Sequence, residues 1–176
     1  MNLKRILLFT AILMIAITSL SMVSAGWFDS DIEADTFKFA GIDGFSDNNA
    51  DIDNGVQLIS DDNGLLNTIT VREIQKDEYD HIVKSESPAS LFVDMNVTEY
   101  KDGEEVSSGP AEFELLKTYD EDGVNIVVEK LVTNHQYTTG VFEKDGSYYC
   151  VQIMGSDSPD DDIQTVKDIK DSLEKK

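Results

Sequence analysis

Alternating apolar and polar positions along most of the chain predict β-strands. The clearest case runs from residue 137 to 154, where two apolar segments flank Asp145-Gly146. That dipeptide suits a two-residue type I′ turn, in which both residues have a positive φ. The turn sets the pairing of Phe142 with Tyr149, Gly140 with Val151, Val141 with Cys150, and Tyr137 with Met154. Because both faces of this hairpin carry apolar side chains, we expect it to lie in a sheet that is covered on both sides.

The same alternation predicts further strands. They cover residues 36–40, 56–60, 68–74, 91–98, 113–119 and 124–132. Six Asp-Gly or Asn-Gly pairs punctuate the chain, and such pairs are typical of hairpin turns. Two stretches, 46–55 and 104–110, are predicted to be loops because turn-forming and acidic residues dominate them. The pattern therefore favours antiparallel strands joined by hairpins.

One internal segment changes to helical spacing. Tyr79, Ile82 and Val83 share a face behind Asp77, which is the expected N-cap. Pro88 ends the segment, because proline cannot continue a helix. We therefore expect a short amphipathic helix between two of the strands.

A second helix is predicted to begin at Ser158 as its N-cap, with Pro159 in the first position, and to continue to Lys176. Its apolar stripe contains Ile163, Val166, Ile169 and Leu173. The three aspartates at 160–162 complement the positive end of the helix dipole, which explains them without a metal. The expected fold class is α+β: a central antiparallel β-sheet covered by a C-terminal helix and one short internal helix.

The N-terminal residues resemble a targeting segment. Lys4 and Arg5 precede an apolar stretch over 6–17, and Val23-Ser24-Ala25 matches a cleavage site. We expect residues 1–25 to be a cleaved signal peptide and residues 26–176 to form a single α+β domain. The alternative is an uncleaved anchor, because residues 6–23 would span about 27 Å as a helix. After cleavage, no remaining stretch is apolar for long enough to insert into a membrane, so the protein is expected outside the cytoplasm, secreted or at the cell surface.

The chain is strongly acidic, with 35 Asp and Glu against 14 Lys and Arg and a net charge of -21. Such a charge repels phosphate groups, which excludes nucleic acid and anionic membranes as favourable partners. Divalent cations and basic proteins are compatible with it. The simpler interpretation is that the acidic surface serves solubility alone.

Cys150 is the only cysteine, so no disulfide can form within the chain. The predicted register places it opposite Val141 in a covered strand. We expect a buried structural residue rather than a reactive thiol, since free cysteine is among the most buried residue types.

The polar loop contains the only metal candidates, Asp47, Asp51 and Asp53. Their alternation is similar to that of calcium-loop ligands, but neither frame places glycine at the sixth position or glutamate at the twelfth. An EF-hand is therefore excluded, and a weak irregular calcium site competes with a solvated loop.

Few residues suggest other chemistry. Asn96 begins an N-glycosylation sequon and falls on the polar face of its predicted strand. His81 is expected at the surface, and neither it nor His135 lies in a recognisable catalytic motif. A carboxylate-dependent hydrolase would need a cleft that brings two acids together. No cofactor-binding motif is present.

Two short motifs resemble the PsbP-like fold family. Residues 37–45 are similar to the family's opening strand and its Pro-x-Gly-Phe turn, with Ile42 in place of the proline, and 169–173 are similar to its closing helix. The resemblance implies a small extracytoplasmic domain with a non-enzymatic accessory or assembly role. Residues 26–29 also resemble the mature ends of small secreted proteins of methanogenic archaea.

These observations favour a secreted or envelope-associated binding or accessory protein that is not an enzyme and that engages a protein partner. The alternative is a domain that binds a divalent cation or a small ligand, through the Asp/Asn loop or a pocket beside the hairpin. A hydrolase is the third and least supported hypothesis.

Overall fold

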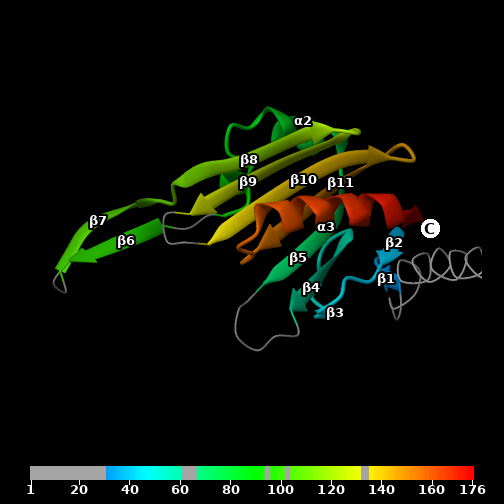
Figure 1. Cartoon of the computed structure of the whole chain (residues 1–176), viewed down its shortest axis with the longest axis horizontal. Helices are drawn as coiled ribbons and strands as arrows, with labels where there is room; N and C mark the ends of the chain where they lie inside the picture. Colours follow the sequence, from blue (N-terminus) through cyan, green and yellow to red (C-terminus); the bar gives the residue numbers. More distant parts are fainter. Residues whose placement is uncertain (1–30, 61–66, 94–95, 102–103, 132–134) are drawn as a thin grey trace, which may run out of the picture. The chain divides into compact units, whose positions relative to one another are not determined.

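A seven-stranded antiparallel sheet forms the centre of the computed structural model, in the order β3-β4-β5-β11-β10-β9-β8 (Figure 1). Its strands are β3 (Phe45–Asp47), β4 (Gly55–Ser60), β5 (Thr68–Ile74), β8 (Phe113–Glu121), β9 (Val124–Leu131), β10 (Gln136–Lys144) and β11 (Ser147–Met154). The structure describes residues 31–60, 67–93, 96–101, 104–131 and 135–176. These residues belong to one compact unit, Asp31–Lys176. The α+β fold class predicted from the pattern is therefore present.

In the described ranges, two smaller sheets and three helical segments accompany the central sheet. β1 (Asp31–Glu33), β2 (Phe37–Ala40) and β12 (Glu174–Lys175) pair in the order β1-β2-β12, and β6 (Asn96–Lys101) pairs with β7 (Glu104–Pro110). The helical segments are α2 (Lys76–Lys84), the 3-10 helix η1 (Pro88–Leu91) and α3 (Pro159–Ser172). No helix in the described ranges is both long and apolar enough to cross a membrane.

The central hairpin β10-β11 has the predicted register at every position that the sequence specified. Asp145 and Gly146 have φ values of 52° and 77°, as a type I′ turn requires. The pairs are Phe142 with Tyr149, Gly140 with Val151, Val141 with Cys150, and Tyr137 with Met154. This agreement confirms that the turn dipeptide fixes which side chains share a face.

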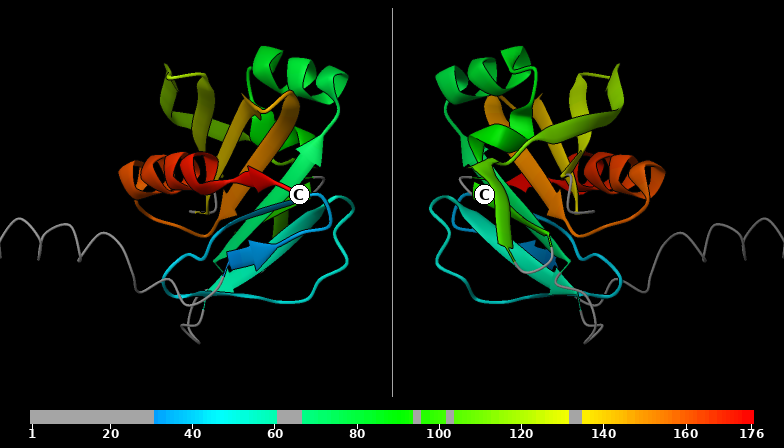
Figure 2. Two further views of the ribbon diagram at one scale, coloured as in Figure 1. Left: turned by 90° about the vertical axis from the view of Figure 1, so that its right-hand side faces the viewer. Right: turned by 90° about the vertical axis from the view of Figure 1, so that its left-hand side faces the viewer.

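Helix α3 covers one face of the sheet, here called the α3 face (Figure 2). Ser158 caps the helix, because its side chain accepts a hydrogen bond from the Asp161 N–H. The predicted stripe is buried: Ile163, Val166, Ile169 and Leu173 all belong to the main core. Phe37 and Phe39 of β2 are fully buried in the same core, which closes this side of the sheet.

Helix α2 and η1 cover part of the opposite face, here called the α2 face. A second, smaller core contains Ile74, Ile82, Val141 and Cys150, with Phe92 packed against it. The prediction that the hairpin is covered on both faces is confirmed for this portion. The remainder of the α2 face lies beyond these helices and holds the candidate site described below.

Several predicted boundaries are wrong. Asp77 is not the N-cap of α2, because the helix already begins at Lys76 and its N-cap, Gln75, makes no side-chain capping bond. The strand expected over 91–98 begins only at Asn96, since Pro88 starts a 3-10 turn instead. The stretch 104–110, expected to be a loop, is strand β7, because pairing with β6 overrides its turn-like composition.

Two further corrections concern the ends of elements. β3 extends into the expected polar loop as far as Asp47, where Ser46 pairs with Ile59 of β4. The last helix ends at Ser172, and the chain then becomes extended so that Glu174 pairs with Lys38 of β2. The predicted signal peptide, 1–25, and the following residues, 26–30, lie outside the described residues.

Candidate functional site

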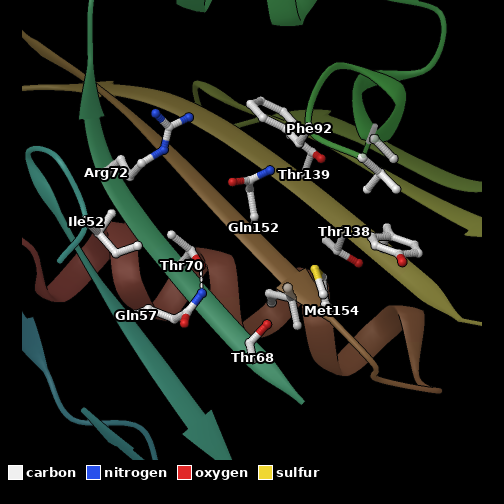
Figure 3. Close-up of a pocket in the computed structure, with 14 residues that line it drawn as sticks. Ile52, Gln57, Thr68, Thr70, Arg72, Phe92, Thr138, Thr139, Gln152 and Met154 are labelled. Carbon is white, nitrogen blue, oxygen red and sulfur yellow. Dashed lines mark hydrogen bonds between the residues drawn. The ribbon is translucent and has the colours of Figure 1, made fainter. Parts of the chain in front are cut away.

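A hollow with a volume of about 280 Å³ opens on the α2 face, next to the region that α2 and η1 cover (Figure 3). Strands β4, β5, β11 and β10 provide its floor, and η1 with the residues that follow it provides one wall. Fourteen described residues line it: Ile52, Gln57, Thr68, Thr70, Arg72, Ala89, Phe92, Val93, Tyr137, Thr138, Thr139, Gln152, Ile153 and Met154.

The floor of the hollow is a row of four polar side chains on adjacent strands. Gln57 pairs with Thr70, Thr70 with Gln152, and Gln152 with Thr139. Partners in register lie on the same face of a sheet, so the four residues form a continuous line across it. We call these four residues the polar row.

Hydrogen bonds orient one end of the polar row. The Gln57 amide oxygen accepts a bond of 2.6 Å from Asn48 Nδ2, and Gln57 Nε2 donates a bond of 3.2 Å to Thr70 Oγ1. Because Thr70 Oγ1 accepts here, its own hydrogen remains available to a ligand. Gln152 and Thr139 make no side-chain hydrogen bond with another described residue. The row therefore offers both donors and acceptors to the hollow.

Arg72 lies two residues beyond Thr70 on the same face and is the charged member of the lining. Its Nη2 donates to Glu78 Oε1 of α2 at 2.9 Å, and the guanidinium stands over the Phe92 ring, 5.8 Å from the ring centre. These contacts pair its charge and tie β5 to the helical wall. Glu78 therefore offsets part of the charge that Arg72 brings to the hollow.

Apolar and aromatic groups surround the polar row. Ile52 precedes β4, Phe92 follows η1, and Met154 at the end of β11 is exposed at 41%. The ring of Tyr137 packs edge-on against Phe113, with ring centres 5.4 Å apart. Burial raises the pKa of the Tyr137 hydroxyl, so this group is neutral at pH 7 and can donate and accept.

A buried carboxylate holds the helical wall in place. Glu129 of β9 is 1% exposed, and its Oε2 accepts a 2.8 Å hydrogen bond from the N–H of Ala89, which lines the hollow. Buried charges need such partners. The alternation of β9 indicated that Val127 and Leu131 share this face, and Glu129 occupies the position between them. Its role is to fix η1 against the sheet.

The lining groups are of the kinds that bind a ligand without covalent contact. Among the fourteen described lining residues there is no carboxylate, imidazole, thiol or amine. The groups that contact the hollow are amides, hydroxyls, one paired guanidinium and apolar side chains. Such groups hold and orient a ligand by hydrogen bonds and apolar contacts.

The predicted metal candidates are not among the residues that line this hollow, although Ile52, between two of them, is. Asp47, Asp51 and Asp53 are exposed, and Asp47 Oδ1 accepts a local hydrogen bond of 2.7 Å from the Asn49 N–H. Within the described ranges, no group of three or more Asp, Glu, His or Cys residues is placed to hold a metal ion. The loop thus shows turn geometry at Asp47 and no gathered ligand set.

Cys150 is 1% exposed, as predicted, and burial raises the pKa of its thiol to about 12 despite the nearby Arg72. His81 and His135 are both exposed and line no part of the hollow. Asn96 begins β6, and its side chain lies outside the described part of the structure. The glycosylation hypothesis therefore stays a prediction.

Asp162 departs from the sequence interpretation. Asp160 and Asp161 are exposed in the first turn of α3, but Asp162 is 4% exposed and faces the sheet. Its Oδ2 accepts hydrogen bonds from Gln136 Nε2 at 2.8 Å and Thr138 Oγ1 at 2.5 Å. Burial raises the pKa of this carboxyl, and the hydrogen bonds oppose the rise. The helix dipole alone does not explain this residue, which anchors α3 to β10.

The exposed apolar side chains that the structure describes on strand β8 give no clear protein-binding surface. Leu115 and Leu116 are 56% and 41% exposed on the edge strand β8. A β-bulge lies between Leu115 and Lys117. Because bulges at sheet edges hinder pairing with another strand, this edge does not indicate a particular protein partner.

The sequence indicates parts of the polar row, but no single strand shows the whole row. Thr70 lies on the polar face of its strand, and the predicted hairpin register already places Thr139 opposite Gln152. The missing step was the pairing of β5 with β11, which joins residues about 80 positions apart in the chain. That pairing depends on tertiary packing and leaves no local pattern.

Comparisons with known proteins find solved structures with a similar fold. No family model matches the sequence, and no curated protein matches it significantly. A solved structure of a variant of the protein Mog1 is similar with a TM-score of 0.49 and 10% identity, covering 82% of this chain and 94% of that chain. The cyanobacterial PsbP (CyanoP) of Synechocystis sp. PCC 6803 is similar with a TM-score of 0.45 and 13% identity, covering 86% of this chain and 95% of that chain.

The second structure belongs to the family whose opening motif residues 37–45 resemble. At these TM-scores and identities, neither similarity assigns this chain to a family or to an activity. The resemblance of residues 26–29 to small secreted archaeal proteins stays a prediction.

Proposed function

We propose that this chain is a non-enzymatic binding protein that acts outside the cytoplasm and holds a small ligand, or a small group of a larger partner, in the hollow on the α2 face. The observation that carries the proposal is the polar row at the floor of the hollow. In this row Gln152 and Thr139 make no side-chain hydrogen bond with another described residue. Polar groups near a protein interior are normally hydrogen-bonded, so groups left open in a hollow suit a ligand.

The rigidity of the walls supports the same proposal. Glu129 fixes η1, Arg72 joins β5 to α2, and Asn48 orients Gln57 before any ligand arrives. A preformed site loses less conformational entropy on binding than a flexible one. The lining chemistry, rich in amides and hydroxyls, supports a binding role over a catalytic one.

The proposed location depends on the N-terminal sequence. Lys4 and Arg5, the apolar stretch 6–17 and the small residues at 23–25 have the order of a secretory signal. Mass measurement of the protein isolated from its producing cells tests this part, with a mature chain beginning at Gly26 as the expected result. A chain that retains residues 1–25 in the membrane fraction would support the anchored alternative instead. The proposal also includes a protein partner. Its support is the net charge of -21, which would attract a basic protein.

Binding in the hollow is testable with isotope-labelled methionine methyl groups. The full chain is titrated with three sets of small molecules: neutral hydroxyl compounds, carboxylates and amines. Met154 lines the hollow, so its methyl resonance is expected to shift with at least one set. The added compounds are expected to be recovered chemically unchanged, because the proposal excludes catalysis.

Two variants make the assignment to this site specific. Gln152→Leu removes hydrogen-bonding groups from the floor and is expected to weaken the response of Met154. Gln164→Leu, on the exposed side of α3, is the matched control and is expected to preserve it. If no set shifts the Met154 resonance, or if the shift is unchanged in Gln152→Leu, the hollow is not the binding site.

A further inference from the structure

The electrostatics of the hollow select against charged ligands. Arg72 is the charged residue among the described lining residues, and Glu78 already pairs with it at 2.9 Å. An anion would meet a guanidinium whose charge Glu78 already partly offsets, and it would also meet the field of a chain with net charge -21. A cation would find no carboxylate among those lining residues. An uncharged ligand meets neither obstacle.

The hydrogen-bonding pattern of the floor suits hydroxyl groups. Thr70 retains a free hydrogen because its oxygen accepts from Gln57. Thr139 offers a hydroxyl, and Gln152 offers an amide with two donor hydrogens and an acceptor oxygen. A ligand that faces this row needs several neighbouring groups that each donate and accept. Adjacent hydroxyl groups on a small ring meet this requirement, whereas an apolar molecule would leave the polar row unsatisfied.

The walls and the size of the hollow further restrict the ligand. Ile52, Phe92 and Met154 present carbon surfaces around the polar row, so the ligand needs apolar C–H groups as well as hydroxyls. The volume of about 280 Å³ lies just under the usual range for small-molecule pockets, which begins near 300 Å³. One ring fits this space better than an extended chain does.

We infer that the hollow binds an uncharged sugar unit, with its hydroxyl groups on the row formed by Gln57, Thr70, Gln152 and Thr139 and its C–H groups against the apolar walls. This inference rests on the proposed function, because it names the ligand class of the same site. The sugar is either a free monosaccharide or the end of a longer glycan, since both present the same ring chemistry.

The experiment compares methyl glycosides that differ in charge. The full chain with labelled methionine methyl groups is titrated with neutral methyl hexosides of the gluco, galacto and manno configurations, and with the corresponding uronate and amino-sugar glycosides. At least one neutral hexoside is expected to shift the Met154 resonance and to bind about tenfold more tightly than its charged counterparts. A second sugar in place of the methyl group of the tightest binder distinguishes a free monosaccharide from a glycan end. Only a site for the end of a glycan keeps or gains affinity for this disaccharide.

Isosteric variants locate the binding energy. Thr139→Val removes one hydroxyl without changing the shape of a side chain that is 4% exposed. It is expected to weaken binding of the neutral glycoside about tenfold, as the loss of one well-placed hydrogen bond does. Thr118→Val, on the exposed edge strand β8, is the matched control and is expected to bind like the unmodified chain. Thermal unfolding of both variants confirms that they are folded.

Three results would overturn the inference: no neutral hexoside shifts Met154, a charged glycoside binds more tightly, or Thr139→Val binds as well as Thr118→Val. The proposed function fails separately. If carboxylates or amines shift Met154 and neutral sugars do not, the hollow binds a ligand of another class and only the sugar inference is wrong. If no compound of any set shifts Met154, both are wrong.

Discussion

Gly140 of β10 lies directly against Val166 of α3, and a Cβ atom added at Gly140 would come within 2.5 Å of Val166 Cγ1. Val166 is fully buried in the main core, so other core side chains surround it. The absence of a side chain at Gly140 therefore sets how closely the helix approaches the sheet.

The variant Gly140→Ala is expected to destabilise the protein by about 1–3 kcal/mol, because overpacking forces the helix or the strand to shift. Urea unfolding followed by circular dichroism measures the change in the free energy of unfolding. Gly109→Ala is the matched control: its added Cβ would meet nothing within 4 Å, so little change is expected. Equal stability of the two variants would show that Val166 does not restrict position 140.

Because of Asp162, the free energy of unfolding is expected to fall as pH rises through the pKa of its carboxyl. Burial raises the pKa of its carboxyl in the folded protein above the value in the unfolded chain. The folded state then binds more protons between those two pKa values, so the favourable contribution is present at low pH and is lost as pH rises through the folded pKa. We expect the free energy of unfolding of Asp162→Asn to increase progressively, relative to that of the unmodified chain, as pH rises from about 3 to 7.

Unfolding free energies measured across this pH range test the Asp162 prediction. The control is Asp161→Asn, one residue earlier and exposed in the same helical turn. It is expected to lose about 0.3–1 kcal/mol at neutral pH, because it removes a favourable charge from the helix N-terminus. A pH trend for Asp162→Asn that runs in the opposite direction would contradict the assigned shift.

Cys150 is expected to resist modification in the folded protein. Its thiol is buried, and its pKa of about 12 leaves almost no thiolate at pH 7. A maleimide or disulfide reagent should label it only when the protein unfolds, so the labelling rate should increase with urea concentration. The unfolded chain in high urea is the control, with labelling at the rate of an ordinary cysteine. Rapid labelling without denaturant would place the thiol at an accessible site.

The last residues of the chain are expected to stabilise its first strands. β12 pairs with β2, the Lys176 N–H donates to the Thr36 carbonyl at 2.9 Å, and Lys176 Nζ contacts Glu33 Oε2 at 2.7 Å. Removing residues 174–176 should cost about 1–3 kcal/mol through the lost backbone hydrogen bonds. It should also accelerate hydrogen exchange in β2.

Lys176→Ala is the control for this truncation. It keeps the backbone pairing. It removes an exposed ion pair, which contributes only about 0–1 kcal/mol, and the hydrogen bond of 2.8 Å from Lys176 Nζ to the Ala34 carbonyl. Its exchange rates in β2 should stay close to those of the unmodified chain. If the truncated and substituted chains behave alike, β12 does not contribute through its backbone.

Local sequence determined those parts of the fold that local chemistry controls. Asp145-Gly146 fixed the register of the central hairpin, and Ser158-Pro159 fixed the start of α3. Strand β7 was missed because its residues individually favour turns and become extended only when paired with β6. Glu129 and Asp162 were missed as buried groups because their charge suggests exposure until their hydrogen-bond partners are known.

The candidate site was less accessible to sequence reasoning than the fold. Its polar row joins Gln57 and Thr70 to Gln152 and Thr139 through a strand pairing between distant parts of the chain. Each of these residues alone is an ordinary polar position on a strand. That they form one floor is evident only when the β5-β11 pairing is known. Side-chain periodicity shows on which face of its strand a residue lies, but it does not show which strand lies beside it.

The pairing of β2 with β12 also determines when the fold can be completed. Because synthesis runs from the N-terminus, β1 and β2 are made long before β12, and the three-stranded sheet cannot close until β12 has been made. Phe37 and Phe39 must wait for α3, which is made shortly before β12, to be covered. A chain that lacks α3 and β12 would therefore leave the aromatic side chains of β2 without their cover.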